Sequence, residues 1–119
     1  MAHKLGAYHH IPHGIANAML LPTVLEFNGE VCYERYQDIL KALGYPAEKY
    51  TKEETIKTLV DIVRDLAEQV GITQTISDYG AKLEDLEMLS KKAMEDPCKP
   101  GNPREVDVEE FIKLYKKAM

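Results

Sequence analysis

The amino-acid sequence predicts an all-α protein, folded as a compact bundle of about five helices. Three observations predict this fold class: apolar residues recur at spacings of three and four, no useful length of chain alternates with a period of two, and helix start and stop signals separate the apolar stripes. The chain has 119 residues, 45% of them hydrophobic and 29% charged, which is typical of one globular domain. We therefore expect residues 1–119 to form a single helical domain.

The first two predicted helices lie in the N-terminal part of the chain. One begins near Pro12, because proline suits the first turn, where its missing amide hydrogen has no partner to lose. Pro22 lies inside the same apolar run and should kink that helix or end its first part. A second helix begins at Cys32 and carries an apolar stripe to Leu43, after which Gly44 supplies a C-terminal stop.

The remaining helices have clearer boundaries. Thr51 and Glu54 form a capping-box pattern that opens the helix with the strongest apolar stripe. The next helix has its stripe over residues 83–94. The segment DPCKPGNPR, with three prolines and a glycine, is predicted to be a loop. After that loop, Asp107 and Glu110 mark the start of a last helix.

The composition excludes several classes of protein. Twenty acidic residues against 15 basic ones give a net charge of −5, so nucleic acid is not an expected partner, since its binding requires a basic surface. The longest apolar stretch, residues 16–25, is too short to span a bilayer, and no signal-peptide pattern opens the chain. Cys32 and Cys98 form no CxxC pair and no disulfide framework, which favours a reduced, cytoplasmic setting.

The four histidines all lie within the first 13 residues, at His3, His9, His10 and His13. A purification tag does not explain them, because tags are unbroken runs. The residues alone leave two explanations: a metal or proton-transfer site, since neutral imidazole is a common ligand of Zn and Fe, or a chance grouping of ordinary core and surface residues. His9 and His10 are adjacent and would point in different directions, and no Asp or Glu precedes Glu26, so a complete metal site from this segment alone is not expected.

The order of the residues carries a more specific indication. The stretch MAHKLGAYHHIPHGIANAMLLPTVLEFN resembles the signature of the iron-containing, metal-dependent alcohol dehydrogenases, with MAH, LGA, PHG, ANA, LLP and FN in that family's order and spacing. The later CKPGNPR resembles the cysteine-containing loop of the same family. The resemblance covers essentially the whole chain. It implies that residues 1–119 correspond to the family's C-terminal helical domain, on the metal and substrate side.

The resemblance implies roles for three residues. His13 matches the family's metal-binding histidine, and His3 matches a histidine near the metal and substrate, where an imidazole can help to carry the hydroxyl proton. Cys98 matches a cysteine near the substrate pocket and the nicotinamide, although as a residue type it can equally be a small loop residue. His9 and His10 match no ligand position and are expected at the surface or in the layer around the site.

The implied activity is that of an NAD(P)-dependent, metal-dependent alcohol dehydrogenase, which interconverts small alcohols and aldehydes by hydride transfer with Fe²⁺ or Zn²⁺. The resemblance also implies that the family's N-terminal dinucleotide-binding domain is absent from this chain, together with the aspartate and two histidines that complete the metal ligands. The sequence then begins inside the family's HxMAH stretch, as a truncated enzyme would. We expect the isolated chain to be inactive and to bind neither metal nor NAD(P) tightly.

The alternative hypothesis is a non-catalytic helical interaction module, in which the apolar face of the ANAMLLP helix binds a partner. Under either hypothesis, apolar surface that lacks its usual cover should promote association of the chain into a homo-oligomer. The expected partners are therefore a small alcohol or aldehyde in the complete enzyme and further copies of the chain. Neither nucleic acid nor a membrane is expected.

Overall fold

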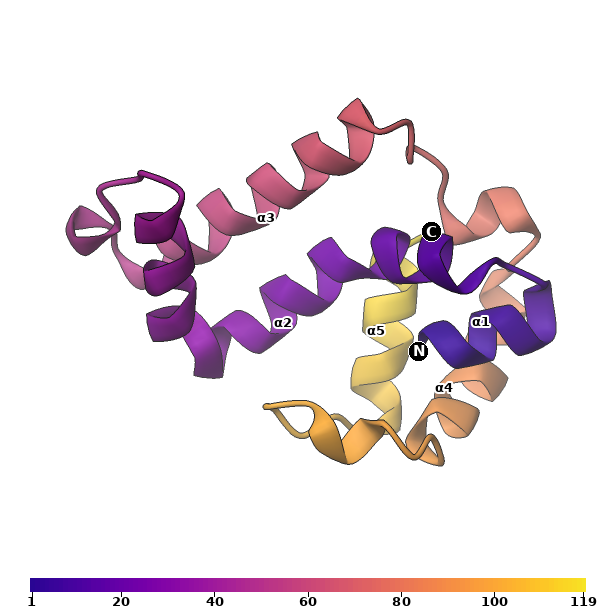
Figure 1. Cartoon of the computed structure of the whole chain (residues 1–119). Helices are drawn as coiled ribbons and strands as arrows, with labels where there is room; N and C mark the ends of the chain where they lie inside the picture. The colour runs from indigo at the N-terminus through magenta and orange to yellow at the C-terminus, as the bar shows by residue number, and fades with distance from the viewer.

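The structure is a computed structural model that describes all 119 residues, and it is all-α, as the sequence predicts. Five α-helices follow one another along the chain (Figure 1): α1 (Ala2–His9), α2 (His13–Ala42), α3 (Lys52–Gln69), α4 (Leu86–Met94) and α5 (Val108–Lys117). Four short 3₁₀ helices lie in the connections: η1 (Ala47–Lys49), η2 (Ile76–Tyr79), η3 (Leu83–Asp85) and η4 (Lys99–Gly101). No helix is both long and apolar enough to cross a membrane.

The helices form a body with a long arm (Figure 1). Helices α1, α4 and α5 gather around the N-terminal part of α2, and the rest of α2 continues away from them with α3 beside it. The body has its own core, made of Leu5, Ile11, Ala16, Leu20, Ile76, Ala81, Leu86, Leu89, Tyr115 and Ala118, with Ala93, Val106, Phe111 and Leu114 next to it at the start of α5. The arm has a second core, made of Tyr36, Leu40, Ala47, Ile56, Leu59 and Val60.

Two helix starts that the sequence predicts are confirmed by their hydrogen bonds. The Thr51 hydroxyl accepts from the Glu54 amide at 3.1 Å, and the Glu54 carboxylate accepts from the Thr51 amide at 3.4 Å. At the start of α5, the Asp107 carboxylate accepts from the Glu110 amide at 2.8 Å. Each such cap contributes about 1 kcal/mol, because it satisfies an amide that the first turn leaves free.

The two helices predicted between Pro12 and Leu43 are one helix, so the start near Pro12 and the end before Gly44 are confirmed and the division between them is wrong. Residues 13–42 form one continuous helix, α2, which passes through Pro22 and Gly29 without a break. Of the two effects expected at Pro22, the end of the helix is therefore excluded. An interior proline costs about 3 kcal/mol. Pro22 and Thr23 are both buried, so tertiary packing offsets that cost.

Helix α1 was not predicted from the sequence, because only one of its residues, Leu5, is buried and no apolar stripe marks it. The helix ends at His10, whose φ of 54° and ψ of 33° lie in the left-handed region. A non-glycine residue rarely adopts this conformation. Here it reverses the chain before Pro12, so that the start of α2 returns to the side of α1. The consequence is that two histidines ten positions apart become neighbours.

Candidate functional site

A cavity of about 540 Å³ opens between α1, the first half of α2 and the segment that leads into α5. Most of its lining is apolar, and its polar side chains are His3, His13, Asn17, Asp96, Cys98, Lys99 and Asn102. This is the size and character of a small-molecule site. The three residues with a role predicted from the sequence, His3, His13 and Cys98, all line this cavity.

The rings of His3 and His13 stack on one another at the cavity. Their centroids are 5.2 Å apart and their planes differ by 14°. His3 lies in the first turn of α1 and His13 is the first residue of α2, so the reversal at His10 brings them together. Both residues are exposed, and their rings can therefore meet a ligand that enters the cavity.

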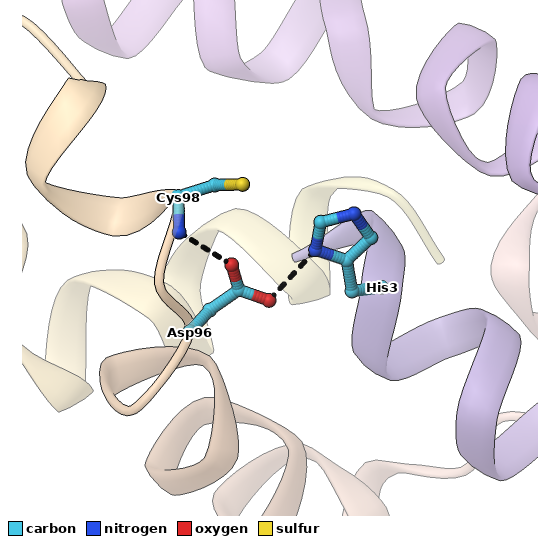
Figure 2. A group of neighbouring side chains, drawn as sticks. All are labelled: His3, Asp96 and Cys98. Atoms are coloured by element: carbon cyan, nitrogen blue, oxygen red, sulfur yellow. Dashed lines mark hydrogen bonds and ion pairs between the residues drawn. The ribbon is translucent and has the colours of Figure 1, made fainter.

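Asp96 also lies at this site, although no motif in the sequence indicates a role for it. Its Oδ2 accepts a hydrogen bond from Nδ1 of His3 at 2.9 Å, and its Oδ1 accepts from the Cys98 amide at 2.8 Å (Figure 2). Burial by itself raises the pKa of this carboxyl, but the hydrogen bonds from the Cys98 amide and from His3 outweigh burial, so the pKa is lowered. Asp96 is therefore a buried, ionised carboxylate at the floor of the site.

Cys98 lies beside this carboxylate as a free thiol on the exposed side of the segment. Its Sγ, a ring nitrogen of His3 and a carboxylate oxygen of Asp96 all lie within 4.8 Å of one another. Figure 2 shows the Cys98 side chain and the His3 ring directed toward one another above Asp96. The structure thus brings together residues from the two ends of the chain.

The donor atoms fit a divalent metal as part of a coordination sphere and not as a complete one. Nε2 of His13 accepts from the Asn17 side-chain amide at 3.1 Å, so this nitrogen carries a lone pair in the neutral ring, and a metal bound there would displace the Asn17 amide. Both oxygens of Asp96 already accept hydrogen bonds. A metal such as Zn²⁺ usually takes three or four protein ligands. His13 can supply one of them, and His3, Asp96 and Cys98, whose ligating atoms lie within 4.8 Å of one another, are the other residues of metal-binding type at the cavity.

The two other histidines do not line the cavity. His10 is exposed at the end of α1. His9 is mostly buried, with Nε2 3.8 Å from a carboxylate oxygen of Asp85 and without a hydrogen bond. His10 is therefore at the surface, as expected, whereas the His9 side chain is only 13% exposed and lies beside Asp85, outside the cavity.

The segment that carries Cys98 is held against α2 by a set of polar contacts that no local sequence pattern predicts. The side-chain amides of Asn28 and Asn102 exchange two hydrogen bonds, at 2.8 and 3.0 Å. Arg104 donates to the Phe27 carbonyl at 2.8 Å, and its guanidinium lies 4.0 Å from the centre of the Phe27 ring. The FN pair of the sequence therefore holds the NPR triplet, and this contact keeps Cys98 at the cavity.

The apolar face of the ANAMLLP segment is largely occupied by the chain itself. Ala16, Leu20 and Pro22 are buried, and Ala16 and Leu20 belong to the core of the body. Leu21 is the large side chain of this segment that stays exposed. The structure therefore leaves little of this face free for a partner, which weakens the hypothesis of an interaction module built on it.

Known proteins of one enzyme family resemble this chain over its whole length. Residues 1–119 match the profile of the C-terminal part of the Fe-containing alcohol dehydrogenase family. The chain is 41% identical over 115 residues to lactaldehyde reductase of Escherichia coli, and 36% identical over 119 residues to NADPH-dependent butanol dehydrogenase of Clostridium saccharobutylicum. Each match covers 97% of this chain and 30% of the relative. The chain thus spans about a third of the length of these relatives.

Solved structures give the same result for the fold. A 1,3-propanediol oxidoreductase superposes with a TM-score of 0.92 at 29% identity, and the alcohol dehydrogenase from Oenococcus oeni with a TM-score of 0.91 at 30% identity. Both alignments cover 99% of this chain and 31% of the other. The arrangement of the five helices, arm included, is therefore one that occurs inside larger enzymes.

Proposed function

Because this chain belongs to the Fe-containing alcohol dehydrogenase family, we propose that it forms the metal- and substrate-side part of an enzyme that interconverts small alcohols and aldehydes by hydride transfer to and from NAD(P). The observation that carries the proposal is the stacked pair His3 and His13 at a mostly apolar cavity, with the Cys98 thiol beside them. A small alcohol fits a cavity of this kind, because its alkyl part needs apolar walls and its oxygen needs a few polar groups.

His13 is the residue that we assign to the metal. His13 lines the cavity, its Nε2 carries a lone pair in the neutral ring that a metal would take over from the Asn17 amide, and imidazole suits both Fe²⁺ and Zn²⁺. When bound, the metal would act as a Lewis acid that polarises the oxygen of the alcohol or aldehyde. The role of this chain is then to hold one corner of the coordination sphere next to the substrate.

His3 is the residue that we assign to proton transfer. Its ring lies against that of His13, so a hydroxyl bound beside His13 comes within reach of Nε2 of His3, which can accept the proton as the alcohol is oxidised and return it in the reverse direction. The hydride itself passes to or from the nicotinamide, whose chemistry is its own. Cys98, whose Sγ lies near the His3 ring, is the residue that we assign to the nicotinamide side of the pocket.

The remaining parts of such an enzyme lie outside these 119 residues. The family match concerns the C-terminal part, and the relatives are about three times as long as the chain. We infer that residues 1–119 are one helical domain and that the dinucleotide-binding domain and the other metal ligands belong to further polypeptide. The isolated chain is accordingly inactive in this proposal, with no tight site for metal or NAD(P).

We also propose that the chain associates with further copies of itself and works in the cytoplasm. Leu66 and Val70, in and just after the second half of α3, are more than half exposed, so association with further copies would remove an apolar stripe from water. The two free cysteines suit a reducing, cytoplasmic setting. A small alcohol or aldehyde is the substrate of the completed enzyme.

Completing the enzyme tests the proposed function. The chain, fused behind the part of E. coli lactaldehyde reductase that precedes the matching region, should gain metal- and NAD(P)-dependent oxidation of small diols, whereas the chain alone should show none. The readout is the absorbance of the reduced nicotinamide, and the control is the fusion with His13→Ala. A folded, metal-loaded fusion without activity would contradict the proposal, and so would activity of the chain alone.

Metal binding by the isolated chain is a separate prediction. Titration calorimetry with Zn²⁺ should detect weak binding that His13→Ala abolishes, since losing a directly coordinating nitrogen should cost more than the roughly 10–100-fold lost with an outer partner of a ligand. His9→Ala is the matched control, because His9 is also an N-terminal histidine and does not line the cavity. If His9→Ala removed the binding and His13→Ala did not, the assignment of the metal ligand would be wrong.

A further inference from the structure

We propose that Asp96 is a positioning residue, which fixes the tautomer and the orientation of the His3 ring so that the unprotonated Nε2 is left to face the substrate. The meaning of this inference for catalysis rests on the proposed function. Its structural content concerns only residues of this chain, and it can be tested without substrate, cofactor or metal.

Asp96 is a buried carboxylate whose two oxygens both have partners. The residue is 5% exposed, and a buried carboxylate is costly unless hydrogen bonds and charges compensate for the lost water. Both of its oxygens are used, Oδ1 by the Cys98 amide and Oδ2 by His3, and the ammonium group of Lys4 lies 4.0 Å from Oδ2. The fold thus holds a charged acceptor rigidly beneath one particular nitrogen of one imidazole.

The tautomer follows from the chemistry of that acceptor. An ionised carboxylate can only accept hydrogen bonds, so Nδ1 of His3 must carry the proton that is shared with Oδ2. In the neutral ring, Nε2 then has the lone pair. Figure 2 shows Nε2 on the side of the ring that points away from Asp96. This is the arrangement in which a carboxylate prepares an imidazole to accept a proton at its far nitrogen.

The orientation follows from two contacts that act together. The hydrogen bond to Asp96 fixes where Nδ1 lies, and the stacking on His13, with planes 14° apart, fixes the tilt of the ring. The same carboxylate also holds the Cys98 amide. Asp96 therefore sets the relative positions of His3 and Cys98, which come from opposite ends of the chain.

A second histidine–aspartate pair shows that proximity alone does not produce this arrangement. His9 lies on the same helix as His3, but its Nε2 is 3.8 Å from Asp85 and makes no hydrogen bond. The Asp85 carboxylate instead accepts from the Lys82 amide at 2.9 Å. The chain therefore contains its own comparison for the pair formed by His3 and Asp96.

Nitrogen NMR of the chain labelled with ¹⁵N-histidine tests the inference, because protonated and unprotonated ring nitrogens resonate in well-separated ranges. At a pH where the rings are neutral, His3 should show one tautomer, with Nδ1 protonated and Nε2 unprotonated. His10, which is exposed, should show a mixture of tautomers. In Asp96→Asn, the amide oxygen stays with the Cys98 amide and the NH₂ group faces Nδ1, so the proton should move to Nε2 of His3.

The controls separate positioning from a general structural role. Asp85→Asn should leave both His3 nitrogens unchanged, and Asp96→Ala should give His3 the mixed signals of His10. A carboxylate that only held the segment through Cys98 would not move the proton of the His3 ring. If wild-type His3 shows a mixture like that of His10, or if Asp96→Asn keeps the proton on Nδ1, the inference is wrong. The wild-type spectrum decides by itself where a variant does not fold, and an inactive fusion enzyme would leave these spectra unaffected.

Discussion

His3→Ala in the fusion enzyme described above should lower kcat by about 10²–10⁴-fold, the usual contribution of a positioned acid or base. The substitution removes the group that accepts the hydroxyl proton, while His13 keeps its place at the start of α2. The KM for the alcohol should change little, because the apolar walls of the cavity remain. Steady-state kinetics and metal analysis of the purified protein are the two measurements.

The metal content of the variants distinguishes a metal ligand from a proton-transfer residue. His13→Ala should lose both metal and activity, whereas His3→Ala should lose activity and keep the metal. His10→Ala is the matched control, since His10 is exposed outside the cavity, and it should leave kcat unchanged. A loss of less than tenfold in His3→Ala, or a loss that parallels the metal content, would contradict the role of His3 in proton transfer.

Gly29→Val should destabilise the fold by about 3 kcal/mol or more, at the upper end of the cost of overpacking. A Cβ atom at Gly29 would lie 2.7 Å from Cγ1 and 3.1 Å from Cγ2 of Ile56, which is closer than packed carbon atoms come. These two atoms are bonded directly to the Cβ of a β-branched side chain, so they cannot rotate away together. Helix α3 would have to move off α2, and thermal or urea unfolding would report the change.

Two further variants locate the cause of this loss. Gly14→Ala, in the same helix, places its Cβ where nothing lies within 4 Å, so the variant should be as stable as the wild type or more stable by up to about 1 kcal/mol. Adding Ile56→Ala to Gly29→Val should cost much less than the sum of the two single effects, because it removes the atoms in conflict. Additive effects would place the clash elsewhere.

The fold class and most helix boundaries could be predicted because their signals are local. The hydroxyl of Thr51 and the amide of Glu54 are three residues apart, and so are Asp107 and Glu110, so the spacing in the sequence already contains the hydrogen bond. The proline-rich segment also lacks long regular structure, apart from the single short turn Lys99–Gly101.

The errors arose where packing outweighed a local signal. Pro22 and Gly29 both disfavour the interior of a helix, yet α2 contains them, because its two halves are buried against two different cores. Helix α1 gives the opposite case. Only Leu5 is buried in it, so its sequence carries no stripe, and its helical form becomes evident only when α2 and α4 surround it.

Some residues of the candidate site could likewise be predicted from the sequence, and others could not. His3, His13 and Cys98 were named from the sequence because their motifs resemble those of a family, and the structure places all three at one cavity. Asp96 was not named, because the sequence presents it as one acidic residue in a loop. Nothing in the spacing of the chain could have paired it with a histidine 93 positions away.

The sequence by itself determined that this protein is helical, where most helices start and stop, and to which family its motifs belong, since these depend on residues within a few positions of one another. The tertiary structure decided that α2 is one helix, that Asn28 pairs with Asn102 across 74 positions, and that Asp96 lies under His3. Such contacts depend on how the helices pack in three dimensions, and the order of residues along the chain does not specify that packing in any pattern of fixed period.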